Sequence, residues 1–165
     1  MREPAERPAL TVGLVGCGLI GHKRADALGE GDVVLGAVDP AAERAAALVA
    51  RHGGRACGRV DELLGLGPDV VVVATTHDQL APLALRCLHA GTHVLVEKPA
   101  GLGTGEIDVL ARTARETGRR VKVGFNHRFH PGLADLAAEV HSGEHGPLMH
   151  LRGRYGHGGR LGYDR

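Results

Sequence analysis

Five short runs of mostly β-branched residues alternate with longer segments rich in alanine and leucine. The runs are continuously apolar, which is typical of strands buried on both faces of a parallel sheet. Repeated strand–helix–strand order predicts an α/β fold, with right-handed crossovers and a doubly wound sheet. We expect strands at Leu10–Val15, Val33–Val38, Val70–Ala74, His93–Val96 and Val121–Gly124, and helices at Leu19–Leu28, Ala41–Arg51, Asp78–Ala90 and Thr104–Thr117. Gly91 and Gly118 directly follow the last two helices, a position that glycine often takes.

The composition excludes several classes of protein. With 43% hydrophobic and 24% charged residues, the 165-residue chain is an ordinary globular sequence rather than a disordered one. A net charge of +1 and 2% aromatic residues provide neither the electrostatic field nor the stacking platform of a nucleic-acid-binding protein. The three cysteines show no Cys-x-x-Cys spacing, residues 1–9 form no apolar signal segment, and the longest apolar run is Val70–Ala74. We therefore expect a cytoplasmic protein with no nucleic-acid or membrane partner.

After Gly124 the pattern changes. Pro131 is expected to open a helix that runs to Val140, followed by a loop over residues 141–147. Leu148–Tyr155 alternates in part and predicts a strand, and the rest of the chain predicts a loop. A lone strand cannot satisfy its own backbone groups. This strand therefore either joins the first sheet or belongs to a second domain of which the chain holds only the start.

A glycine loop follows the first expected strand and opens the first helix. It reads Gly16-Cys17-Gly18-Leu19-Ile20-Gly21, the Gly-x-Gly-x-x-Gly fingerprint of dinucleotide binding. Gly16 permits the tight turn, Gly18 lets a pyrophosphate approach the backbone, and Gly21 lets the helix pack against the strand. The helix N-terminus offers free N–H groups to the phosphates. All six residues are candidate cofactor contacts in a Rossmann-type fold, and the alternative is a merely structural turn.

Asp39 ends the second expected strand, 18 residues beyond Gly21. An acidic residue about 20 residues beyond the loop hydrogen-bonds the ribose of NAD, and its charge repels the 2′-phosphate of NADP. Arg44, one helical turn later, would instead favour NADP. Asp39 is also suited to capping the helix after it. We expect NAD as the cofactor, with NADP as the less favoured alternative.

Two further segments carry a resemblance to a known family. The first is Ala90-Gly91-Thr92-His93-Val94-Leu95-Val96-Glu97-Lys98-Pro99, and the second is Val123-Gly124-Phe125-Asn126-His127-Arg128-Phe129-His130-Pro131. Together with the glycine loop and Asp39, they make the chain from Leu10 onward resemble the glucose-fructose oxidoreductase and inositol dehydrogenase family, Gfo/Idh/MocA. Glu-Lys-Pro is the most specific of these elements. It follows an expected strand, at the sheet edge where α/β proteins bind ligands.

The resemblance implies roles for individual residues. Lys98 would be the catalytic residue, reaching the nicotinamide and the reacting oxygen, and Glu97 would contact the cofactor and fix the turn. Thr75 and Thr76 would line the cofactor path, and Asn126 and Arg128 would face the nicotinamide or the substrate. The resemblance also suggests a cis Lys98–Pro99 bond. The family usually has proline at the position of Thr76 and histidine three or four residues later, whereas His77 comes directly after Thr76 here. His77 therefore either contacts the cofactor or only starts a helix.

The C-terminal segment is basic, and Tyr155, His157 and Arg160 are its candidate substrate-binding residues. The alternative is a solvated strand face and loop. The histidine pairs, His127 with His130 and His141 with His145, lack zinc-site spacing, so we expect no metal.

We expect a disordered tail at 1–9, an NAD(P)-binding Rossmann domain at 10–125 and, at 126–165, the incomplete start of an α+β substrate domain. Family members are much longer, so the chain is expected to lack the aspartate and histidine that their second domain supplies. The implied activity is hydride transfer between nicotinamide and a secondary alcohol or ketone of a sugar, inositol or sugar nucleotide. The alternatives are a non-catalytic dinucleotide-binding module and an NAD redox sensor. A full-length relative is expected to form a homo-oligomer.

Overall fold

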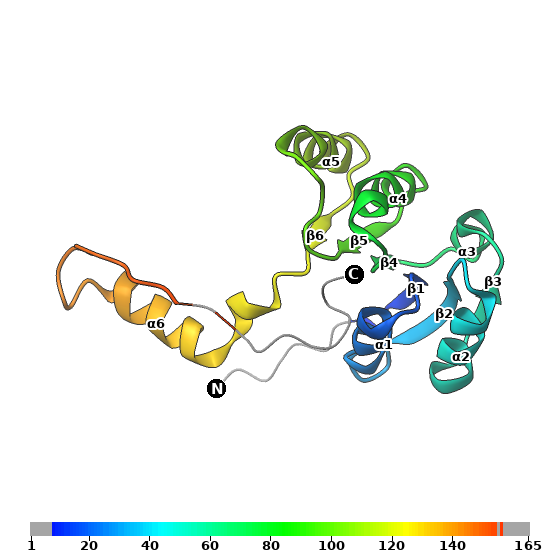
Figure 1. The fold of residues 1–165 in the computed structure, drawn as a ribbon, viewed down its shortest axis with the longest axis horizontal. Helices are drawn as coiled ribbons and strands as arrows, with labels where there is room; N and C mark the ends of the chain where they lie inside the picture. The colour runs from blue at the N-terminus through cyan, green and yellow to red at the C-terminus, as the bar shows by residue number, and fades with distance from the viewer. Residues whose placement is uncertain (1–7, 155, 157–165) are drawn as a thin grey trace. The chain divides into compact units, whose positions relative to one another are not determined.

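The computed structural model describes residues 8–154 and residue 156, and a six-stranded parallel sheet forms the centre of its first unit. The strand order is β3-β2-β1-β4-β5-β6, and every neighbouring pair is parallel. The bounds are β1 (Thr11–Val15), β2 (Val33–Val38), β3 (Arg55–Cys57), β4 (Val70–Val73), β5 (His93–Val96) and β6 (Val121–Val123). Figure 1 shows the sheet edge-on between its helices. The expected doubly wound Rossmann-type sheet is confirmed.

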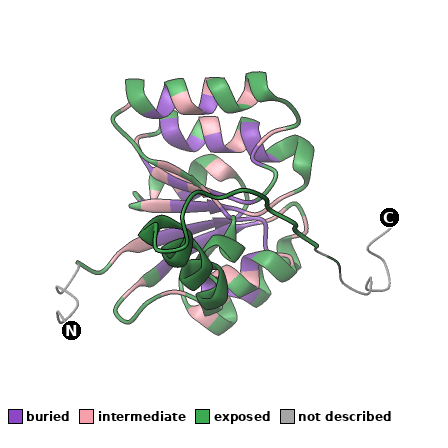
Figure 2. Ribbon diagram, turned by 90° about the vertical axis from the view of Figure 1, so that its left-hand side faces the viewer, coloured by how far each residue is buried: buried purple, intermediate pink, exposed green. Residues whose placement is uncertain are grey.

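Helices cover both faces of the sheet, because each face is apolar. They are α1 (Leu19–Asp26), α2 (Ala42–His52), α3 (Val60–Gly65), α4 (His77–His89) and α5 (Thr104–Glu116). One core cluster holds residues of α1 and α2, including Leu48, and the other holds residues of α3, α4 and α5, including Leu63 and Leu80. Figure 2 shows the buried residues gathered in the strands and on the inner sides of these helices. None of the helices within the described residues is long and apolar enough to cross a membrane.

Up to residue 125, the expected helices and strands are found with ends that shift by a residue or two. Gly91 and Gly118 have φ of +82° and +65°, so both end a helix in the left-handed conformation that glycine adopts without strain. Two elements, β3 and α3, were not predicted. β3 has three residues at the edge of the sheet, and α3 has six. Segments this short carry too few apolar positions to establish a period.

The chain divides into two compact units after Phe125. The second unit contains a 3-10 turn at Asn126–Phe129 and α6 (Pro131–Ser142), so the helix expected from Pro131 is present. Every residue that the structure describes in this unit is exposed. The strand prediction for Leu148–Tyr155 is wrong over 148–154, which the structure describes without regular secondary structure, while Tyr155 lies outside the described residues. Partial alternation produces a strand only where a neighbouring strand satisfies its backbone groups.

Candidate functional site

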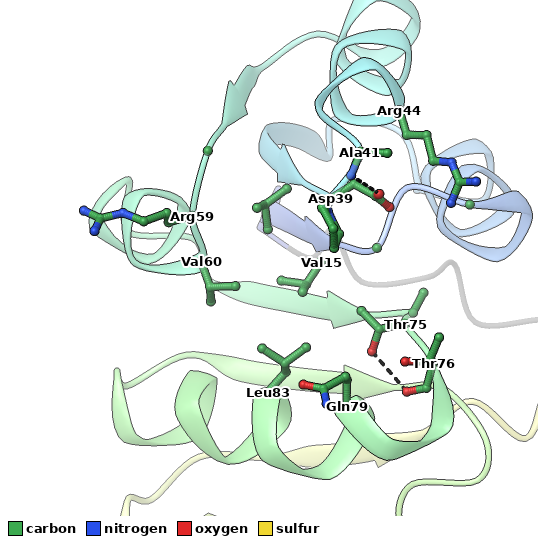
Figure 3. Close-up of a pocket in the computed structure, with 16 residues that line it drawn as sticks. Val15, Asp39, Ala41, Arg44, Arg59, Val60, Thr75, Thr76, Gln79 and Leu83 are labelled. Atoms are coloured by element: carbon green, nitrogen blue, oxygen red, sulfur yellow. Dashed lines mark hydrogen bonds between the residues drawn. The ribbon is translucent and has the colours of Figure 1, made fainter.

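A cleft of about 630 Å³ opens at the carboxyl ends of β1, β2 and β4. The strand order reverses between β1 and β4, and open α/β sheets bind ligands at such a switch point. The lining includes Gly16 and Gly18 from the loop after β1, Asp39 after β2, and Thr75 and Thr76 after β4. Figure 3 shows these segments facing one another across the cleft. The structure therefore brings together five of the predicted cofactor-binding residues.

The three glycines of the loop lack side chains for different reasons. Gly16 has φ of +94°, and a Cβ there would lie 2.3 Å from the carbonyl oxygen of Ala74. A Cβ at Gly21 would lie 2.1 Å from the carbonyl oxygen of Gly16. A Cβ at Gly18 would meet no described atom within 4 Å. Packing within the fold thus explains Gly16 and Gly21, whereas Gly18 leaves open space that suits the close approach of a pyrophosphate.

Asp39 ties the glycine loop to the start of α2. Its Oδ2 accepts the backbone N–H of Cys17 at 2.8 Å, and its Oδ1 accepts that of Ala41 at 2.9 Å. Figure 3 shows the second of these bonds. A carboxylate offers about four acceptor positions, so each oxygen keeps one for a ribose hydroxyl. Supporting the helix start and binding a ribose are therefore compatible tasks for this side chain.

The cleft also contains residues that were not predicted. Gly58 and Arg59 form the turn between β3 and α3, and Val60 is the first residue of α3. Gln79 and Leu83 lie one helical turn apart on α4. The i, i+4 spacing of Gln79 and Leu83 places them on one helix face, but only the strand order shows that this face lines the cleft. The β3–α3 turn was missed because neither of its flanking elements was predicted.

Two arginines lie at the edge of the cleft. Arg44 lies on the same side as Asp39, whereas Arg59 points outward and pairs with Glu62 at 3.6 Å (Figure 3). Arg44 is therefore the cation placed to meet a phosphate beside Asp39.

The Glu-Lys-Pro turn follows β5, the strand next to β4. The Lys98–Pro99 bond is cis, as expected. Lys98 is exposed, whereas Glu97 is 8% exposed. The Glu97 carboxylate faces α1, where Arg24 Nε donates to its Oε1 at 2.5 Å. The contact joins the residue before Lys98 to α1. The two predicted roles of Glu97, fixing the turn and contacting the cofactor, stay predictions.

The remaining predicted residues that the structure describes are not among those that line the cleft. Leu19 and Ile20 are exposed at the start of α1, and His77 is the exposed first residue of α4. Asn126 and Arg128 belong to the second unit. His157 and Arg160, as well as Tyr155, lie outside the described residues. The roles of these residues stay predictions.

Cys17 contacts Asp39 through its backbone N–H, whereas its thiol points away from solvent. The side chain is buried, and its Sγ lies 3.6 Å from the carbonyl oxygen of Val38. Burial, with a smaller effect from the charge of Asp39, raises the pKa of the Cys17 thiol to about 12. We expect iodoacetamide to leave Cys17 unmodified in the folded chain at mildly alkaline pH, because the thiolate is the nucleophile. Mass spectrometry before and after unfolding in urea checks this. Equal labelling in both states would contradict it.

Known proteins share this fold. The family model described as "Oxidoreductase family, NAD-binding Rossmann fold" matches residues 10–125. The inositol 2-dehydrogenase of Leifsonia xyli is 35% identical over 151 residues, which cover 88% of this chain and 44% of that enzyme.

Solved structures agree with this match. UDP-N-acetylglucosamine 3-dehydrogenase from Acidithiobacillus ferrooxidans has a TM-score of 0.76 and 32% identity, over 81% of this chain and 44% of that one. GenD2 from gentamicin A biosynthesis, solved in complex with NAD, has a TM-score of 0.81 and 32% identity, over 87% of this chain and 42% of that one. The chain thus spans less than half the length of these relatives. Residues 10–125 cover most of the chain, so the protein belongs to the Gfo/Idh/MocA oxidoreductases through their NAD-binding Rossmann fold.

Proposed function

We propose that this chain is the nucleotide-binding part of an NAD-dependent oxidoreductase. The enzyme would move a hydride between nicotinamide and a secondary alcohol or ketone of a sugar, inositol or sugar nucleotide. The observation that supports this best is the Asp39 carboxylate facing the same cleft as Gly16 and Gly18. In this proposal, residues 10–125 bind the cofactor and residues 126–165 begin the substrate domain. The substrate class rests on the names of the relatives, which include inositol and UDP-N-acetylglucosamine dehydrogenases.

In this proposal the cleft binds the ribose of the adenosine and the pyrophosphate. Asp39 would accept the two ribose hydroxyls on its remaining acceptor positions. The pyrophosphate would lie over Gly18, the N-cap of α1, where no described side chain makes a capping bond. The unpaired N–H groups of the first helical turn are therefore available to an anion.

Lys98 would act at the reacting end. When bound, NAD supplies the centre that accepts or donates the hydride. The ammonium group of Lys98 would stabilise the alkoxide that develops on the substrate and assist movement of its proton. Asn126 and Arg128 would face the nicotinamide or the substrate. The candidate substrate-binding residues are Tyr155, His157 and Arg160.

The test is calorimetric titration of the 165-residue chain with NAD+ and with NADP+, followed by turnover assays on inositol, sugars and UDP-sugars. Saturable binding that favours NAD+ is expected. A chain that is folded by circular dichroism yet binds neither nucleotide would contradict the proposal. Binding without turnover would instead favour the dinucleotide-binding module, and a marked affinity difference between NAD+ and NADH would favour the redox sensor.

Gly18→Val provides a sharper test of the site. Because its Cβ has open space in the fold, the variant is expected to melt like the wild type. NAD+ affinity should fall by more than about tenfold, because the side chain occupies the space of the pyrophosphate. Gly105→Ala is a matched control, since its Cβ also meets open space but lies on α5. Equal NAD+ affinity in Gly18→Val and the wild type would place the pyrophosphate elsewhere.

A further inference from the structure

We propose that Arg24 is a positioning residue for Lys98 and acts through Glu97. The inference rests on the proposed function and adds a part of the site that lies outside the motifs of the sequence. Arg24 is on the last turns of α1, and Glu97 directly precedes Lys98 at the end of β5. The two side chains are 73 residues apart in the sequence and are joined by the 2.5 Å contact between Nε and Oε1.

The Glu97 carboxylate is enclosed by the fold. Its side chain is 11% exposed and that of Arg24 is 25% exposed. A Cβ at Gly124 would lie 2.8 Å from both carboxylate oxygens, so the carboxylate fits only because residue 124 has no side chain. The backbone N–H of Glu97 donates to the carbonyl oxygen of Val73 at 2.9 Å, and the backbone N–H of Gly124 donates to the carbonyl oxygen of Val96 at 2.8 Å. Glu97 is therefore held between α1 and the end of β6.

A charged group in such a place needs a reason, because burying a carboxylate is costly unless it is paired. An apolar side chain could fill the same space. A charge-assisted hydrogen bond adds direction, since it fixes both the separation and the orientation of its partners. Here the pair fixes the residue next to the proposed catalytic lysine. The Arg24 guanidinium also balances the negative charge of Glu97, so that this charge does not have to be balanced by Lys98.

Helix α1 consequently connects the proposed pyrophosphate site with the turn that carries Lys98. The N-terminus of α1 faces the cleft and would hold the pyrophosphate, while Arg24 near its other end holds the turn that carries Lys98. Because a short helix moves as a rigid element, the Arg24–Glu97 pair sets where Lys98 stands relative to a cofactor bound at the glycine loop. Loss of the pair should leave adenosine binding intact and displace Lys98 from the nicotinamide.

The experiment follows NADH bound to the 165-residue chain. The emission of the reduced nicotinamide is observed directly on the bound cofactor. Arg24→Gln and Lys98→Ala are each expected to change the bound-NADH emission to the same value. The double variant should show no additional change, because the two residues would act as one unit. NAD+ affinity measured by calorimetry should change by less than about threefold in Arg24→Gln, because Asp39 is not a partner of this pair. Arg24→Lys, which keeps the charge, should restore part of the wild-type emission.

The matched control is Arg51→Gln. Arg51 lies on α2 and pairs with Asp26 of α1 at 2.7 Å, so this variant also removes an ion pair made by α1 but leaves Glu97 untouched. It should emit like the wild type. A folded Arg24→Gln that emits like the wild type, with only a lower melting temperature, would overturn the inference and make the pair a structural fastening.

Two further outcomes are separable. If Arg24→Gln fails to fold, Glu97→Gln replaces it, because glutamine has the shape of glutamate without its charge. Changed NADH emission in Glu97→Gln would then support the inference, and wild-type emission would overturn it. Absence of NADH binding by the folded wild-type chain would overturn the proposed function, and the inference with it. Wild-type binding with an unchanged Arg24→Gln would overturn the inference alone.

Discussion

Replacing Asp39 by alanine is expected to weaken NAD+ binding by about 100-fold or more. Hydrogen bonds to a charged group contribute about 1.5–3 kcal/mol each, and two ribose hydroxyls would lose them. At about 1.4 kcal/mol per factor of ten, even the lower estimate exceeds two orders of magnitude. The variant also frees the backbone N–H groups of Cys17 and Ala41, which would loosen the loop that holds the pyrophosphate.

The same variant should narrow or reverse the preference between NAD+ and NADP+. The charge that repels a 2′-phosphate is gone, while the Arg44 side chain still lines the cleft. Calorimetry with both nucleotides measures the change, and a circular dichroism melt establishes that the variant is folded. Asp39→Asn is the milder companion, since it keeps an acceptor oxygen for the loop. A folded Asp39→Ala variant that retains wild-type NAD+ affinity would show that the ribose is not bound by this carboxylate.

Lys98→Ala is expected to slow hydride transfer by about 100- to 1000-fold, the usual cost of removing one group that stabilises developing charge on oxygen. Binding of NAD+ should change little, because Lys98 is exposed at the end of β5 and does not line the cleft that holds Gly18 and Asp39. The measurement is NADH formation on whichever inositol or sugar substrate the wild-type chain oxidises, together with NAD+ calorimetry.

Lys122→Ala is the matched control for this prediction. It removes an exposed lysine from β6, the neighbouring strand, and should turn over like the wild type. Turnover of Lys98→Ala at the wild-type rate would show that another group polarises the reacting oxygen. A loss of NAD+ binding in the same variant would instead assign Lys98 to the cofactor rather than to the chemistry.

Local patterns in the sequence were sufficient for most of the fold. Continuous β-branched runs such as Val70–Val73 form buried parallel strands because both faces of the sheet are covered. The glycine loop and Asp39 were recognisable because each sits at the end of such a strand, and the carboxyl ends of parallel strands share one edge. The resemblance at Glu97-Lys98-Pro99 extended this to the family, which the comparison with known proteins confirmed.

Local patterns and motifs thus identify the parallel sheet, the glycine loop at the start of α1, and the family. Tertiary structure decided which side chains share the site with them. Gln79 and Leu83 line the cleft only because β4 lies beside β1, and Arg24 meets Glu97 only because α1 packs near the end of β5. The physical reason is range: turn and helix preferences act over a few residues, whereas these contacts join segments that the winding of the sheet brings together. The wrong strand prediction at 148–154 also reflects this limit. A strand needs a neighbouring strand to satisfy its backbone groups, and its own residues do not specify that neighbour.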